Sequence, residues 1–208
     1  MTLMLSVHII LIVVICIVSF LAFNRPELMS RFQFNAWSIV HRKQYLRLFS
    51  HGFLHGDWIH LFINMFVLWS FGTAVLFYFD HFLPGMTEVR FLILFFSALA
   101  FSSFYSLIKH KDNPNYNAVG ASGAVSAIVF AAIFFDPYNP VYLFGFIRIP
   151  GIIFGVLYLW YSAHMARKQV DNIGHDAHFW GAVYGFIFPL FYEPKLFLHF
   201  IEQLTSFR

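Results

Sequence analysis

The feature that most constrains this chain is a series of long apolar runs separated by short polar segments. The six runs occupy residues 3–23, 58–79, 89–108, 119–135, 149–166 and 177–192. A helix of about 20 apolar residues crosses a lipid bilayer. Charged residues make up only 11% of the chain, against about a quarter in soluble domains. We therefore predict an all-α, polytopic membrane protein with six transmembrane helices in a single domain, residues 1–208.

The segments outside these runs have a different character. The connection 24–57 mixes charges with aromatic residues, so we expect it to lie in the membrane interface. The tail 193–208 alternates apolar and charged residues and is expected along the membrane surface. The first run lacks a preceding basic residue and a clear cleavage site, which favours a retained helix over a signal peptide. Cys16 is the single cysteine, so no intrachain disulfide can form.

Polar residues at the start of three runs are the main indication of function, because lipid does not tolerate them without a role. His60 and Asn64 lie one helical turn apart in the second run. Ser122 opens the fourth run and His178 the sixth. In a serpentine of six helices, these three runs start on the same side of the membrane. All four side chains are therefore expected at a similar depth of roughly 5–10 Å.

Small residues predict that the fourth and sixth helices touch. Gly181 and Gly185 have the spacing that lets membrane helices meet backbone to backbone, and His178 precedes them by one turn. A matching stripe of small residues occurs in the fourth run: Gly123, Ala127 and Ala131. Such packing would bring Ser122 within hydrogen-bond reach of His178. A serine and a histidine in contact form the minimal activated nucleophile, because the imidazole accepts the hydroxyl proton during attack.

The same residues include candidates to stabilise an oxyanion. Ser122 is expected in the first turn of its helix, where amide groups have no intrahelical acceptor and the helix dipole is positive. His60 and Asn64 would add side-chain donors from the second helix. One such donor is worth about 3–4 kcal/mol in comparable hydrolases.

These motifs resemble those of the rhomboid proteases, a family of intramembrane serine proteases. Segment 120–123, Gly-Ala-Ser-Gly, is similar to the GxSG motif of the family, in which Ser122 would be the nucleophile. Segment 177–185 resembles its AHxxGxxxG pattern, with His178, Gly181 and Gly185 in the defining positions. The HxxxxHxxxN pattern of its second helix is matched by three residues: His55, His60 and Asn64. The resemblance covers nearly the whole chain and fits the compact six-helix bacterial type.

The resemblance implies a Ser122–His178 dyad without an acidic third member. His60, Asn64 and the Ser122 amide would hold the oxyanion, and His55 would shape the surrounding hydrogen bonds. The motif is supported by small residues: Gly120, Gly123, Gly181 and Gly185. Substrates of the family are single-span membrane proteins, cut where their helix unwinds easily. The resemblance implies no cofactor and no metal, and it places the chain as a multi-pass protein in the bacterial cytoplasmic membrane.

One departure from the family pattern concerns the histidine. The family commonly has an aromatic residue one turn after the serine, beneath the catalytic imidazole, and here that position is Ser126. We expect Ser126 or a ring from elsewhere to orient His178.

Other interpretations stay open. The first is a catalytically silent rhomboid-like protein that binds membrane helices. The second is a membrane metalloenzyme that uses its histidines and two acidic residues: His51, His55, His60, His175, His178, Asp57 and Asp176. The third is a transporter, against which the absence of an inverted repeat in the sequence argues. The net charge is only +3 and the sequence has no basic run, so nucleic acid is not expected as a partner.

Membrane orientation and oligomeric state also stay open. The family orientation places segment 25–47 outside the cytoplasm. That segment contains five basic residues, against the positive-inside tendency.

Overall fold

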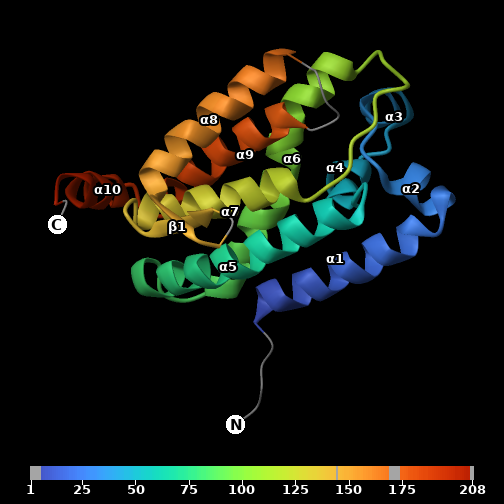
Figure 1. Cartoon of the computed structure of the whole chain (residues 1–208). Helices are drawn as coiled ribbons and strands as arrows, with labels where there is room; N and C mark the ends of the chain where they lie inside the picture. The colour runs from blue at the N-terminus through green and yellow to red at the C-terminus, as the bar shows by residue number, and fades with distance from the viewer. Residues whose placement is uncertain (1–5, 144, 169–173, 207–208) are drawn as a thin grey trace, which may run out of the picture.

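The computed structural model describes residues 6–143, 145–168 and 174–206, and it is built mostly of helices (Figure 1). The longest helices follow the order of the predicted runs: α1 (Val7–Phe23), α5 (Trp58–Phe82), α6 (Thr87–His110), α7 (Ser122–Phe135), α8 (Gly151–Lys168) and α9 (His175–Ile187). Shorter helices lie between and after them: α2 (Pro26–Phe32), α3 (Ala36–Arg42), α4 (Arg47–Ser50), the 3₁₀ helices η1 (His51–Phe53) and η2 (Phe188–Phe191), and α10 (Leu196–Thr205).

The prediction of a purely helical chain is wrong at one place. Strands β1 (Pro140–Leu143) and β2 (Ile147–Pro150) pair antiparallel after α7, with Val141 opposite Ile149. Asp136 and Pro137 end the preceding helix, and the segment that follows is rich in residues that favour extended structure. Because Ile149 and Pro150 belong to β2, the predicted start of the fifth helix at residue 149 is corrected to residue 151.

Other helix boundaries also differ from the prediction: α5, α6, α8 and α9 extend two or three residues beyond their predicted runs at one or both ends, and two helices are shortened. The fourth helix begins at Ser122 rather than residue 119, because Gly120 has a φ of 122°, which a right-handed helix cannot contain. The last helix ends at Ile187 rather than Tyr192, and η2 continues it. Pro189 has no amide hydrogen, so the regular helix cannot extend through it. Residues 3–5 of the first predicted run lie outside the described residues.

Helix α7 is the centre of the bundle, with α5, α6 and α9 packed around it (Figure 1). Every residue from Gly123 to Phe135 is buried. A helix that is apolar on all sides requires such surroundings. Buried phenylalanines of α7 and its neighbours fill much of this core: Phe79, Phe91, Phe95, Phe134, Phe135 and Phe188.

The predicted contact between the small residues of α7 and α9 is confirmed. A β-carbon placed on Gly181 would overlap the carbonyl oxygen of Gly123, and one placed on Gly185 would overlap that of Ala127. The two helices therefore touch backbone to backbone over two successive turns, in the same direction along the bundle. This contact fixes how the start of α9 lies beside the start of α7.

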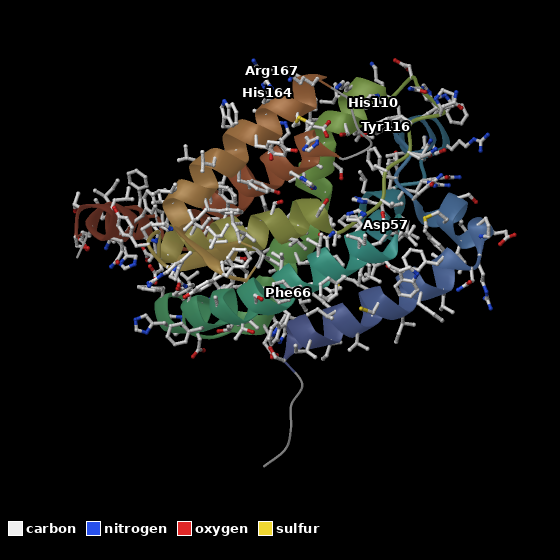
Figure 2. The ribbon with its side chains drawn as sticks, viewed as in Figure 1. Asp57, Phe66, His110, Tyr116, His164 and Arg167 are labelled. Atoms are coloured by element: carbon white, nitrogen blue, oxygen red, sulfur yellow. The ribbon has the colours of Figure 1, made fainter. Side chains whose placement is uncertain are left out.

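The outside of the bundle is apolar as well. On α5, the side chains of Ile59, Phe62 and Phe66 are between 52% and 73% exposed, and Phe66 lies on this outer face (Figure 2). Soluble proteins rarely expose such continuous apolar surfaces. By length and composition, α5 and α6 are able to cross a membrane, whereas α1 and α7 are apolar but shorter. The count of six spans therefore stays a prediction.

The connection 24–57 packs at the end of the bundle where α5, α7 and α9 begin (Figure 1). The Arg47 guanidinium donates hydrogen bonds to the carbonyls of Ser30 (2.9 Å) and Gln33 (2.7 Å). Phe34 and Ala118 exchange two backbone hydrogen bonds of 2.9 and 3.1 Å. The connection thereby holds the loop that leads into Ser122. The tail forms α10 at the opposite end, and its placement along a membrane surface stays a prediction.

Candidate active site

Ser122 is the first residue of α7 and is half-buried between the fully buried residues Ala121 and Gly123. The turn that leads to it depends on Gly120, whose φ of 122° favours glycine. The Gly120 amide donates to the carbonyl oxygen of His51 at 3.0 Å. The serine therefore lies at the start of a buried helix, and the loop before it is held by the hydrogen bond to His51.

His60 lies over the same turn. A β-carbon placed on Gly120 would be 2.7 Å from Cε1 of His60 and 3.8 Å from Oγ of Ser122, so both groups border one small space. Asp57 caps α5 by accepting a hydrogen bond from the His60 amide at 2.8 Å. Asn64 is buried and uses one of its two amide hydrogens to donate to the His60 carbonyl at 2.9 Å.

His178 lies one turn before Gly181, beside the first turn of α7. Its ring is nearly parallel to that of Tyr158 on α8, with an angle of 25° and 6.3 Å between ring centroids. The ring of His175 meets it edge-on at 5.9 Å. The Tyr158 hydroxyl forms a 2.6 Å hydrogen bond with Oγ of Ser126. Ser126 thus bonds to the tyrosine beside the histidine, and its part in orienting His178 stays a prediction.

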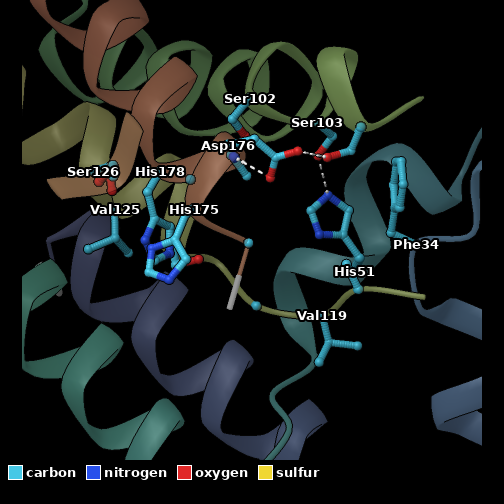
Figure 3. Close-up of a pocket in the computed structure, with 18 of the residues that line it drawn as sticks. Phe34, His51, Ser102, Ser103, Val119, Val125, Ser126, His175, Asp176 and His178 are labelled. Carbon is cyan, nitrogen blue, oxygen red and sulfur yellow. Dashed lines mark hydrogen bonds between the residues drawn. The ribbon is translucent and has the colours of Figure 1, made fainter. Parts of the chain in front are cut away.

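A single cavity of about 1190 Å³ brings the predicted site residues together. Its lining includes Ser122, His178, His60, Asn64, Gly120 and Gly123. Figure 3 shows His178 on one side of this pocket and His51 on the other. Gly181 and Gly185 lie below it in the α7–α9 contact. The four polar residues chosen from the sequence therefore face a common space, although they come from three separate helices.

The wall opposite His178 is polar (Figure 3). The Ser103 hydroxyl donates to the Leu99 carbonyl at 2.8 Å and accepts from Nε2 of His51 at 3.2 Å. Ser106 donates to the carboxylate of Asp176 at 2.8 Å. Burial lowers the pKa of His51 to about 4, so its imidazole is neutral at pH 7. This wall offers hydrogen-bond donors and acceptors near the serine, and the neutral imidazole of His51 is one of them.

His55 lies between His60 and the first helix, α1. It is fully buried, and its Nδ1 lies 2.9 Å from the hydroxyl of Ser19 on α1, which donates to the Phe53 carbonyl. Its ring meets that of His60 at 5.0 Å and an angle of 72°. Burial lowers the pKa of His55 to about 3, so it is also neutral at pH 7. His55 therefore packs against His60 and links it to the first helix.

A family model for the rhomboid domain matches residues 42–194, which includes all of these residues except Ser19. This chain belongs to the rhomboid family. A search of curated proteins finds "RHOMBOID-like protein 12, mitochondrial" from Arabidopsis thaliana, which is 29% identical over 175 residues. That match covers 77% of this chain and 50% of the plant protein, so this rhomboid spans about half the length of its relative.

Some residues that line the cavity of this rhomboid are not predicted from the sequence as members of the candidate site. Tyr158 and Ser103 were not singled out, and Asp176 was considered only as a metal ligand. Tyr158 lies on the cavity face of α8, four residues from both Phe154 and Ser162, which also line the cavity. That spacing is a signal for one helical face. The spacing does not indicate which residue of another helix packs against that face.

The metalloenzyme interpretation receives no support from the described ranges 6–143, 145–168 and 174–206. Within them, no group of three His, Cys, Asp or Glu side chains is arranged to hold a metal ion.

For the protease activity predicted from the sequence, replacing Gly120 by alanine is expected to lower kcat about 100-fold, comparable with the loss of one oxyanion donor. The new β-carbon would lie 2.7 Å from the His60 ring, so the imidazole must move away from the space above Ser122. The measurement is kcat and KM for a model single-span substrate in detergent. Gly56→Ala is the matched control, because Gly56 lines the same cavity and its β-carbon would meet nothing within 4 Å. Equal kcat values for the two variants would contradict the expectation.

Proposed function

We propose that this rhomboid-family protein is an intramembrane serine endopeptidase that cleaves single-span membrane proteins with a Ser122–His178 dyad. The observation that carries the proposal is the shared cavity. It is lined by Ser122 from the first turn of α7, His178 from the start of α9, and His60 and Asn64 from α5. A nucleophile, a base and two donors facing one space are the parts required for acyl transfer.

The first step is attack by Ser122. In the proposed reaction, Oγ adds to the carbonyl carbon of the substrate while His178 takes the hydroxyl proton as general base. A helical peptide bond is shielded by its own backbone, so the substrate must become extended to enter the cavity. A small residue at the cleavage point would ease that unwinding.

The tetrahedral intermediate carries a negative charge on the former carbonyl oxygen. The Ser122 amide at the helix start, the His60 ring and the second amide hydrogen of Asn64 are the donors that we assign to it. Collapse of the intermediate breaks the C–N bond, and His178 returns its proton to the leaving amine. Water then hydrolyses the acyl-enzyme by the same sequence and restores the serine.

We further propose that the six longest helices, α1 and α5 to α9, cross the membrane. The apolar outer faces of α5 and α8 support this, and the charged residues Arg167 and Lys168 stand at the end of α8 (Figure 2 labels Arg167). We retain the bacterial cytoplasmic membrane as the proposed location, because the six predicted runs and their motifs resemble those of the bacterial type. The plant relative carries a mitochondrial name, which makes localisation of the native protein the direct test.

The proposal is tested by a chemical and an enzymatic measurement on the purified chain in detergent. We expect cleavage of a model single-span substrate that resists metal chelators. We also expect a serine-directed fluorophosphonate to block it and to modify Ser122, as located by mass spectrometry. Activity that vanishes with chelators and ignores the phosphonate would establish the metalloenzyme instead. Binding of the substrate helix with neither cleavage nor labelling would establish a catalytically silent rhomboid-like protein.

A further inference from the structure

The ring that lies against His178 comes from a helix that carries neither reacting group. We propose that Tyr158 on α8 is the positioning residue of His178 and holds its imidazole in the orientation that accepts the Ser122 proton. This inference rests on the proposed protease function, because it assigns a role inside the same site.

The geometry of the two rings is suited to that task. Their planes differ by 25° and their centroids are 6.3 Å apart, within the range of offset stacking. A nearly parallel neighbour restricts rotation of the imidazole about its side-chain bonds. Because a ring contact of this kind engages neither ring nitrogen, it is compatible with proton transfer at the imidazole.

Tyr158 is itself held from the helix that carries the nucleophile. Its hydroxyl bonds to Ser126 at 2.6 Å, and Ser126 lies one helical turn after Ser122 on α7. The rings of Phe130 and Phe154 contact Tyr158 at centroid distances of 5.7 and 5.6 Å. The His178 ring is thus connected to α7, the helix of the serine, through its contact with Tyr158 and the hydrogen bond from Tyr158 to Ser126.

A second contact between a tyrosine of α8 and a histidine of α9 lies one turn away, with a different ring angle. Tyr161 on α8 meets His175 on α9 edge-on, with 5.6 Å between ring centroids. The two tyrosines and the two histidines are each three residues apart, so two Tyr–His pairs connect α8 to the start of α9. The orientation of His178 therefore depends on α8 staying beside α7 and α9. A displacement of α8 would release the ring that positions the base.

Three substitutions separate the contribution of the Tyr158 ring from that of its hydrogen bond to Ser126. Tyr158→Leu removes the ring, Tyr158→Phe keeps the ring but loses the hydroxyl, and Ser126→Ala removes the partner of that hydroxyl. Trp160→Leu is the matched control, because it removes a ring from the exposed face of the same helix. For each protein, the measurements are kcat, KM, the rate of Ser122 labelling by a fluorophosphonate, and the unfolding midpoint in detergent.

We expect Tyr158→Leu to lower kcat about 10- to 100-fold, because a base displaced by about 1 Å loses rate on that scale. The labelling rate should fall in parallel, while KM stays within about twofold because the ring is assigned no substrate contact. Tyr158→Phe and Ser126→Ala should each lower kcat about threefold, the loss expected for one hydrogen bond. Trp160→Leu should match the unchanged protein.

The outcomes are distinguishable. An active wild-type protein whose Tyr158→Leu variant keeps the wild-type kcat and labelling rate would overturn this inference alone. The inference would also fail if kcat falls only in proportion to the folded fraction, or if Tyr158→Phe loses as much activity as Tyr158→Leu. A wild-type protein that neither cleaves nor reacts with the phosphonate would overturn the proposed function, and this inference with it.

Discussion

Ser122→Ala and His178→Ala are each expected to abolish cleavage of a single-span substrate, with a fall in kcat of up to about 10⁶-fold, as in hydrolases whose serine and histidine act as a unit. Alanine at position 122 removes the nucleophile. Alanine at position 178 leaves the hydroxyl protonated and therefore weakly nucleophilic. Because neither residue can contribute to catalysis without the other, the double variant should cleave no more slowly than either single variant. Initial rates of substrate cleavage in detergent provide the measurement.

Matched controls are available on the neighbouring helices α5 and α8. Ser70→Ala removes an exposed hydroxyl from α5 that bonds only to its own helix, at the Phe66 carbonyl, among the interactions that the described residues show. His164→Ala removes an exposed imidazole from α8. Both controls should cleave at the wild-type rate. Cleavage that persists in Ser122→Ala and His178→Ala at the level of the controls would exclude the dyad.

The second large effect is expected at the contact between α7 and α9. Gly185→Ala should destabilise the folded protein by about 2–3 kcal/mol, because overpacking a tight contact forces the backbone to move. The added methyl group would overlap the Ala127 carbonyl oxygen, which belongs to a helix backbone and has no rotamer to escape by. Since α9 carries His178, cleavage should also fall by about 100-fold as the base moves away from Ser122.

Gly155→Ala is the control for this prediction. Gly155 also lies in a contact between two helices, but its β-carbon would meet the Phe130 ring at 3.4 Å, an ordinary packing distance. Alanine also has the higher helix propensity, so this variant should be neutral or slightly stabilised. Reversible unfolding in mixed detergent micelles measures the stability of both variants. Equal midpoints would show that the close α7–α9 contact does not exist in solution.

The candidate site was largely foreseeable because its members break a strong background pattern. In an apolar run, Ser122, His178, His60 and Asn64 are conspicuous, and their position at the start of alternate runs predicts a common depth. The spacing of Gly181 and Gly185 predicts a close helix contact, which the structure confirms. These inferences need only the chain direction and the helical period.

Other features could not be foreseen from local patterns. The start of α7 at Ser122 depends on the φ of Gly120, which is held by a hydrogen bond to His51, far earlier in the chain. The hairpin of β1 and β2 pairs residues whose apolar character fits either a helix or a strand. The partner of Ser126 is a tyrosine on a different helix. Each of these depends on which surfaces meet, and sequence spacing does not specify that.

The sequence by itself determined the apolar runs, the small-residue stripes and the identity of the polar residues, because each of these follows from local composition and the 3.6-residue period. The tertiary structure alone decided that His51 faces Ser103, that His55 packs behind His60 and that Tyr158 lies against His178. Such contacts join residues from different helices, and they are fixed by the packing of whole helices around α7.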